Sequence, residues 1–315
     1  MTQAQRRGAR AFGAFLVAAG AAGGLAMGSG PANATELELQ RAAQRALGDR
    51  PGTVVALDAR DGRLLALVNP RVAATAAYPL GSLAKLVTGM AALDAGLTDG
   101  ARRIVCKGQF ERWKCWRVHG EQTFEHALAN SCSIYFFTVG RELGATRLTR
   151  AFQASGFGRV TGSDLADEAP GRLTPARTLA DVTELAYGDT RALLATPLQV
   201  ASWLGAIANG GTRYAPHVSP APPQVLGGLP ALGGLELVRS GMRRAVLGGS
   251  AIGADVPRMA VHGKTGTTTH LTAVNRRHGW FAGYAGNRVV VVFVKDGNGY
   301  DVAAPIAREV FDAWL

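Results

Sequence analysis

The sequence predicts an α/β (α+β) protein, in which an antiparallel sheet is flanked by helices and an all-helical lobe is inserted in its middle. Strand patterns occur near both ends of the chain, and residues from about 97 to 195 are mostly helical and turn-rich. The 315 residues are 47% hydrophobic and 18% charged, which suits a globular protein with a sizeable core.

The first 34 residues have the pattern of a secretory signal peptide. Three arginines without an acidic residue precede a small, apolar run, and Ala32-Asn33-Ala34 supplies an A-x-A cleavage pattern. The alternative is an uncleaved membrane anchor, but the high Gly and Ala content favours cleavage after Ala34. We therefore expect residues 35–315 to fold outside the cytoplasm, in the periplasm or on the extracytoplasmic face of the membrane.

The N-terminal part of the predicted fold is a helix followed by a hairpin. Leu37–Leu47 is amphipathic, and the apolar runs Thr53–Asp58 and Arg63–Val68 flank the turn residues Asp61-Gly62. A second helix begins near Ser82 and ends at Gly96, with apolar residues at helical spacing.

The C-terminal part is predicted to supply the other strands. After a helix capped by Thr196 and Pro197, residues 215–234 are rich in Pro and Gly and indicate an exposed connection. The remaining elements are expected in this order: a helix at Leu235–Leu247, strands at Arg258–Thr268, Arg277–Ala285 and Arg288–Lys295, and a helix at Ala303–Leu315.

The chain is basic. Its formal net charge is +11, of which the three arginines of the N-terminal segment account for +3, leaving +8 for the rest. A positive surface favours anionic partners such as wall polymers or lipid headgroups, although a basic composition is also a habit of some genomes. Basic–aromatic interleaving and zinc-finger spacing are absent, so nucleic acid is not an expected partner.

Ser82 and Lys85 form the first candidate catalytic pair. They are three residues apart at the start of an apolar helix, so they lie on one face of its first turn. A buried lysine with a depressed pKa is able to take a proton from a nucleophilic hydroxyl. The alternative is chance, because Ser and Lys fall three apart in many chains.

Two further polar clusters accompany this pair. Ser131 and Ser133 flank a cysteine in HALANSCSIYFF. Because hydroxyls two residues apart cannot share one helix face, we expect a break in the helix here. The alternative is that these serines only cap the local backbone. The run Lys264-Thr265-Gly266-Thr267 ends a strand and combines an ammonium, two hydroxyls and exposed backbone N–H groups. It suits an extended ligand that bears a carboxylate, and a polar hairpin turn is the alternative.

The three cysteines are Cys106, Cys115 and Cys132. In an oxidising compartment, a Cys106–Cys115 bridge would stabilise the fold by roughly 2.5–3 kcal/mol, and Cys132 is expected to be a buried free thiol. The histidines show no H-E-x-x-H spacing and no C-x-x-C is present, so we expect neither a metal site nor an organic cofactor.

The motifs S-x-x-K, S-x-S and K-T-G occur in the order typical of penicillin-binding proteins and serine β-lactamases. The segments WKCWRVHGEQTFEHALANSCSIYFF, LLATPLQVASWLGAIANGG and GWFAGYAGNRVVVVFVKDG are similar to those around the second and third motifs of class B penicillin-binding proteins. The resemblance covers about residues 50–315. It implies a β-lactamase/transpeptidase-like fold, with a penicillin-binding transpeptidase domain at 35–315.

The resemblance also implies a role for each motif residue. Ser82 would be acylated and Lys85 would activate it, while Ser131 would relay a proton to the leaving amine. Lys264 would hold this network and keep Lys85 neutral by charge repulsion. Backbone N–H groups of Ser82 and Thr267 would form an oxyanion hole. The hydroxyls of Thr265 and Thr267, beside Gly266, would bind the terminal carboxylate of the substrate.

The implied activity is D,D-transpeptidation of peptidoglycan stem peptides that end in D-Ala-D-Ala, with β-lactams as covalent inhibitors. The sequence departs from the family pattern at Ser133, which stands where Asn or Asp is usual. We also expect a bare transpeptidase domain without the N-terminal pedestal of class B enzymes. The alternatives are a D,D-carboxypeptidase or class D-like β-lactamase, and a catalytically weak penicillin-binding or sensor module.

Overall fold

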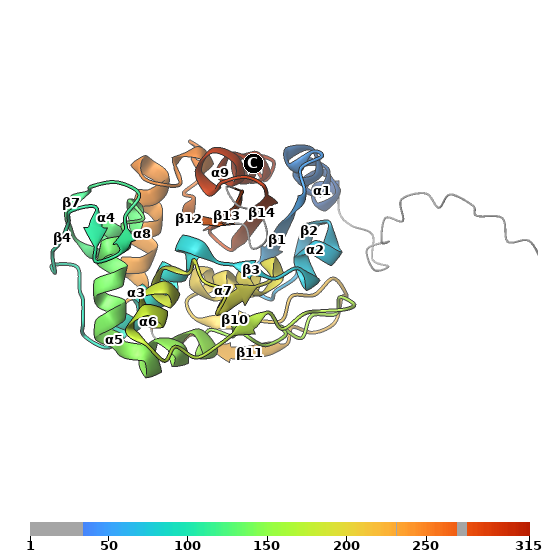
Figure 1. The fold of residues 1–315 in the computed structure, drawn as a ribbon. Helices are drawn as coiled ribbons and strands as arrows, with labels where there is room; N and C mark the ends of the chain where they lie inside the picture. Colours follow the sequence, from blue (N-terminus) through green and yellow to red (C-terminus); the bar gives the residue numbers. More distant parts are fainter. Residues whose placement is uncertain (1–33, 231, 270–275) are drawn as a thin grey trace, which may run out of the picture.

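Helices cover both faces of a five-stranded sheet in the computed structural model, which describes residues 34–230, 232–269 and 276–315 (Figure 1). The signal-peptide prediction, except for Ala34, lies outside the described residues. The sheet is antiparallel throughout and its strands are ordered β12-β13-β14-β1-β2. Their bounds are Gly52–Asp58 (β1), Leu64–Val68 (β2), His262–Thr269 (β12), Arg277–Ala285 (β13) and Arg288–Lys295 (β14).

Alternation along β14 shows how the sheet separates two cores. Val289, Val291 and Phe293 pack into one hydrophobic cluster, and Val290, Val292 and Val294 pack into the other. Successive side chains of a strand point to opposite faces, so a strand with apolar residues at every position is buried on both sides.

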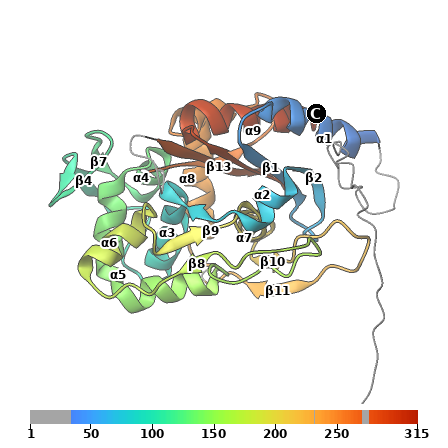
Figure 2. The same ribbon diagram turned by 45° about the vertical axis from the view of Figure 1, so that its right-hand side comes forward.

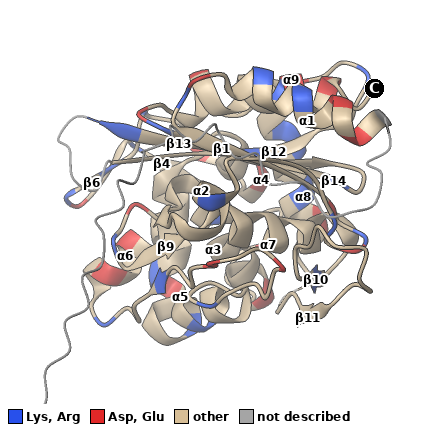
Figure 3. Ribbon diagram, turned by 90° about the vertical axis from the view of Figure 1, so that its right-hand side faces the viewer, with Lys and Arg blue, Asp and Glu red and all other residues tan. Residues whose placement is uncertain are grey.

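The helices divide between these two faces (Figures 1 and 2). α1 and α9 pack together over one face, and the opposite face contacts α7. A charge-coloured view shows the same layers edge-on, with the larger helical part below the sheet (Figure 3). The helices are α1 (Ala34–Leu47), α2 (Pro70–Thr75), α3 (Ala84–Asp94), α4 (Phe124–Ala129), α5 (Ser133–Ala154), α6 (Leu179–Tyr187), α7 (Pro197–Asn209), α8 (Leu235–Gly248) and α9 (Ala304–Asp312).

The helix α7 begins as its sequence predicts. Thr196 accepts a hydrogen bond from the backbone N–H of Gln199, and the Gln199 side chain bonds back to the Thr196 N–H. This capping box satisfies two N–H groups that the first helical turn leaves free. Gly210 ends the helix in the left-handed conformation.

The inserted segment 97–195 is not wholly helical, which corrects the prediction of an all-helical lobe. It carries strands of two or three residues that are too short to show alternation in a sequence. Their bounds are Ile104–Cys106 (β4), Gln109–Phe110 (β5), Trp113–Lys114 (β6), Gly120–Gln122 (β7), Arg172–Leu173 (β8) and Leu193–Ala195 (β9).

Two other short pairings were not predicted, and one of them involves residues 225–228 of the predicted 215–234 connection. Tyr78–Pro79 (β3) pairs with β9, and Thr212–Tyr214 (β10) pairs with Val225–Gly228 (β11). Within the described ranges, no helix combines the length and apolar character that a membrane span requires.

Candidate active site

Ser82 lies in a 3₁₀ turn, Gly81–Leu83, that leads directly into α3. The turn is held at its start because the Gly81 N–H donates to the Gly188 carbonyl at 3.0 Å. The Trp280 indole donates to the Pro79 carbonyl at 2.8 Å, which fixes the chain just before the turn. Ser82 is half-buried, whereas residues 84–90 of α3 are buried. Its hydroxyl is thus on a rigid turn that remains partly accessible.

The Ser82 turn lies against β12, the edge strand of the sheet. Gly81 has a φ of +53°, and a Cβ added to it would lie 2.8 Å from the Thr267 carbonyl oxygen. A Cβ on Gly266 would lie 2.7 Å from the Leu80 carbonyl oxygen. Glycine is the residue that permits both the left-handed backbone and this close approach. The two segments therefore meet because side chains are missing on both sides.

Lys85 is fully buried on the first turn of α3 and points to the break between α4 and α5. Its Nζ donates to the Ser131 carbonyl at 2.8 Å and to Ser133 Oγ at 3.0 Å, with Ser131 Oγ at 3.4 Å. Among the hydrogen bonds of the described residues, none joins Lys85 to Ser82. Burial lowers the pKa of Lys85 to about 8, so its amine is a usable base near neutral pH.

Ser131 links this lysine to the third motif. Its Oγ accepts a hydrogen bond from Lys264 Nζ at 2.9 Å, and Lys264 has no exposed surface. Burial, together with the nearby Lys85 charge, holds the pKa of Lys264 well below its usual range. Two ammonium groups so close in a dry site repel each other, which disfavours charging both.

The backbone at Ser131 adopts a conformation that few non-glycine residues use. Its φ is +54°, in the left-handed region. This conformation ends α4 and turns the Ser131 carbonyl toward Lys85, while Oγ faces Lys264. The break predicted from the paired hydroxyls is confirmed, since α4 ends at Ala129 and α5 begins at Ser133. Strain of this kind is common at functional sites.

The structure places the remaining predicted residues as follows. Ser133 Oγ accepts a hydrogen bond from Lys85 Nζ at 3.0 Å, so a serine in the place of the usual Asn or Asp still contacts the lysine. The Thr265 hydroxyl donates to the Ser250 carbonyl at 2.9 Å, which occupies its proton. The Thr267 hydroxyl accepts from the Gly299 N–H at 3.1 Å and keeps its own proton for a ligand.

Sequence reasoning missed the part played by Ser250, which follows α8. Its carbonyl holds Thr265, and its Oγ lies 3.5 Å from Lys264 Nζ. No spacing or pattern singles out a serine in a loop of small residues. The Cys106–Cys115 disulfide prediction is wrong, because all three cysteines are free buried thiols.

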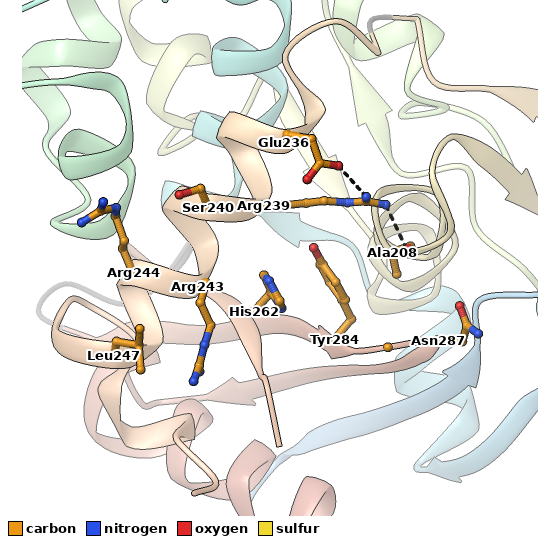
Figure 4. A pocket seen from close by; sticks show the side chains of 11 residues that line it. Ala208, Glu236, Arg239, Ser240, Arg243, Arg244, Leu247, His262, Tyr284 and Asn287 are labelled. Atoms are coloured by element: carbon orange, nitrogen blue, oxygen red, sulfur yellow. Dashed lines mark hydrogen bonds and ion pairs between the residues drawn. The ribbon is translucent and has the colours of Figure 1, made fainter. Parts of the chain in front are cut away.

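A separate, basic hollow of about 740 Å³ lies along α8 (Figure 4). His262 and Tyr284 stack on its floor with ring centroids 4.8 Å apart. Its three arginines already have acidic partners: Arg239 pairs with Glu236, Arg243 with Asp255 and Arg244 with Glu125. Because these charges are paired, the hollow offers little to an anion.

The site combines a serine before an apolar helix, a buried lysine one turn on, and a hydroxyl that lies between this lysine and a second buried lysine. These are the groups that serine acyl transfer requires. The model of the penicillin binding protein transpeptidase domain matches residues 52–312. The chain belongs to this family, as its three motifs predict.

Relatives and solved structures agree with this assignment. The chain is 27% identical to the peptidoglycan D,D-transpeptidase MrdA of Acinetobacter baumannii, over 88% of this chain and 52% of that protein. It is 28% identical to PbpA of Mycobacterium tuberculosis, over 86% of this chain and 68% of that protein. It therefore spans about half the length of the first of these relatives.

The fold is also that of solved penicillin-binding proteins. The crystal structure of Pseudomonas aeruginosa PBP2 in complex with WCK 5153 is 28% identical and matches with a TM-score of 0.78, over 88% of this chain and 76% of that chain. The transpeptidase domain from Eggerthella lenta is 26% identical with a TM-score of 0.76, over 88% and 80%. The predicted α/β fold of the β-lactamase/transpeptidase type is confirmed.

Proposed function

We propose that this chain is a serine D,D-transpeptidase that cross-links peptidoglycan stem peptides. The observation that carries the proposal is Ser131 Oγ, which accepts from the buried Lys264 and lies 3.4 Å from the buried Lys85. Such a hydroxyl between two amines is able to relay a proton between them. The names of the relatives, two of which are peptidoglycan D,D-transpeptidases, support the same substrate.

The first step is acylation. Ser82 Oγ attacks the carbonyl of the penultimate D-Ala, and the hydroxyl proton passes to neutral Lys85. The carbonyl oxygen becomes an oxyanion, for which the N–H groups of Ser82 and Thr267 are the expected donors. The proton then moves through Ser131 to the departing nitrogen, the C–N bond breaks, and D-Ala leaves as a free amine.

The second step transfers the acyl group. An amine from a neighbouring stem peptide attacks the Ser82 ester, a new amide bond forms, and the proton of the amine returns to the Ser82 oxygen through Lys85. The edge of β12 is the expected place for the extended donor strand, because its outer backbone groups lie beside the Ser82 turn. Thr267 is the expected ligand of the terminal carboxylate, because its hydroxyl keeps its own proton.

The test is a mass spectrum of the purified full chain after treatment with penicillin. We expect one covalent adduct on Ser82, which is absent in Ser82→Ala and Lys85→Ala, and D-Ala release from a stem pentapeptide that depends on an added acceptor amine. Fast steady-state turnover of a chromogenic β-lactam would favour a β-lactamase, and D-Ala release without acceptor a carboxypeptidase. Absence of any adduct on folded protein would leave only a binding or sensor module.

We propose in addition that the protein is exported and that its signal peptide is cleaved. The N-terminal sequence pattern supports this, since a basic start, an apolar run and an A-x-A site precede Thr35. The same mass spectrum tests it: a mature chain beginning at Thr35 is expected, and retention of the first 34 residues would show an anchor instead.

A further inference from the structure

Three cysteines and a histidine that the acyl-transfer chemistry does not use gather beside the second motif. Cys106 ends β4, Cys115 follows β6, His119 precedes β7, and Cys132 lies in the break between α4 and α5. Their four potential ligand atoms all lie within 4.8 Å of one another. Residues far apart in the chain thus present three sulfurs and a ring nitrogen to one point.

The distances suit a tetrahedral metal. His119 Nδ1 lies 3.4 Å from Cys106 Sγ and 3.4 Å from Cys115 Sγ. With metal–sulfur bonds of about 2.3 Å and metal–nitrogen bonds of about 2.0–2.1 Å, a tetrahedron has N···S edges of about 3.6 Å and S···S edges of about 3.8 Å. The cluster is therefore nearly the size of a zinc coordination shell before any ion binds.

We propose that Cys106, Cys115, His119 and Cys132 bind one Zn²⁺ ion in a closed, structural site. Thiolate and imidazole ligands in a tetrahedral Cys₃His set are typical of zinc, and hard ions such as Mg²⁺ and Ca²⁺ prefer oxygen. The cysteines are 1%, 8% and 0% exposed in chain order, so the three sulfurs are shielded from solvent, while His119 is half-buried.

Two backbone features help to stabilise thiolate ligands in this buried cluster. The backbone N–H of Ser133 donates to Cys115 Sγ at 3.2 Å. Cys132 is the N-cap of α5, where the N–H groups of the first helical turn supply a partial positive charge. Both features stabilise negative charge on sulfur. Trp116 packs edge-on against the His119 ring, with centroids 5.2 Å apart, and limits its rotation.

The site would also fix the second motif. Cys132 lies between Ser131 and Ser133, and Cys115 holds the Ser133 N–H. A metal bound to both cysteines joins the β4–β7 segment to the break that carries Ser131 in its left-handed conformation. This consequence for catalysis rests on the proposed function, whereas metal binding itself does not.

The experiment measures zinc in the full chain, purified without a metal-affinity tag and without chelator. We expect one zinc per chain by elemental mass spectrometry, its release by a mercurial that blocks thiols, and its loss in Cys115→Ser and His119→Ala. The matched control is His126→Ala, since His126 is exposed and is not part of the cluster. This control should keep its zinc.

Cobalt substitution keeps the test valid where a cysteine variant does not fold. Wild-type chain reconstituted with Co²⁺ should show the intense visible bands of tetrahedral cobalt and the near-ultraviolet charge-transfer bands of thiolate ligands. Three outcomes would each overturn the proposal. They are weak cobalt spectra of the octahedral type, loss of zinc from reduced protein after incubation with Zn²⁺ and desalting, and a disulfide among the three cysteines.

A separate measurement tests the link to the second motif. Zinc-free protein is expected to react with a fluorescent penicillin about tenfold or more slowly than zinc-loaded protein. Equal labelling rates of the zinc-free and zinc-loaded forms would reject the positioning role but not the metal site itself. Absence of penicillin labelling in both forms would count against the proposed function and not against the metal.

Discussion

Replacement of Ser131 by alanine should abolish most acylation and leave the fold nearly intact. The hydroxyl accepts from Lys264 at 2.9 Å and lies 3.4 Å from Lys85. Without it, Lys264 keeps the Thr265 carbonyl at 2.9 Å, and Lys85 keeps the Ser131 carbonyl at 2.8 Å. Both amines stay hydrogen-bonded, so the free energy of unfolding should fall by about 1–2 kcal/mol.

The expected effect on rate is much larger. Loss of a positioned proton relay costs about 10²–10⁴-fold, which is about 2.7–5.5 kcal/mol in the activation barrier. The assay is stopped-flow acylation by a fluorescent penicillin, with chemical denaturation measured on the same samples. Acylation of Ser131→Ala within a few-fold of the wild-type rate would refute the relay.

Ser131→Gly is the matched control for backbone strain. It removes the same hydroxyl, but glycine adopts a φ of +54° at little cost. We expect Ser131→Gly to be more stable than Ser131→Ala by about 1 kcal/mol and equally slow in acylation. A large difference between their acylation rates would mean that the turn, and not the hydroxyl, is what catalysis needs.

The remaining predictions concern pH, turn geometry and a helix cap. Because burial lowers the pKa of Lys85 to about 8, acylation should rise with pH and level off above that value, and a rate unchanged from about pH 6 to about pH 9 would contradict this. Between about pH 8 and the ordinary lysine pKa of about 10.4, the unfolded chain binds more protons than the folded chain. Lys85 therefore destabilises the fold fully below about pH 8, and the free energy of unfolding rises with pH through this window by up to about 1.4 kcal/mol per pH unit. Denaturation of wild type and Lys85→Met across the window measures the difference. Gly81→Ala should remove acylation because the new Cβ would collide with β12. The control Gly96→Ala also has a positive φ, of +68°, but no atom within 4 Å of its new Cβ, so it should lose only about 1 kcal/mol of stability. Equal penicillin labelling of the two variants would disprove the contact argument. Thr196→Ala should lower the free energy of unfolding by about 1–2 kcal/mol through loss of the α7 cap, and it should leave acylation unchanged. A denaturation midpoint equal to that of wild type would show that the cap contributes nothing.

The long elements of the fold were predictable because their patterns are local. The strands at Arg277–Ala285 and Arg288–Lys295 agree with β13 and β14, and the Thr196 cap and Gly210 stop agree with α7. β12 begins at His262, four residues later than predicted, because the preceding apolar residues pack in a loop. Short strands such as β4 and β7 depend on their partners and leave no periodic signal.

The candidate site was predictable in its residues and less so in its contacts. Spacing placed Ser82 and Lys85 on one turn, but the turn is 3₁₀ and the lysine is hydrogen-bonded to Ser131 and Ser133. The sequence shows no sign of the carbonyl of Ser250 that binds Thr265. Hydrogen bonds between distant segments follow from tertiary packing, which single-sequence patterns do not encode.

The cysteine cluster also depends on contacts between distant segments that the sequence does not encode. The spacing of Cys106 and Cys115 suggested a pair, because two thiols nine residues apart in an oxidising compartment usually form a bridge. His119 and Cys132 join them only after β4 pairs with β7 and the chain turns into α4. The four-residue set has no standard zinc spacing, so the sequence could not distinguish a disulfide from a metal shell.

The break between α4 and α5 explains why these features lie together. A left-handed serine costs about 1–2 kcal/mol, and a strained turn persists only where its surroundings determine it. Here Lys85 binds the Ser131 carbonyl from α3, Lys264 binds its hydroxyl from β12, and Cys132 anchors the next residue among the thiols. Removing any one of the three contacts leaves the other two to hold the turn. The left-handed turn should therefore survive the loss of any one contact, even where acylation is abolished because the base Lys85 is gone.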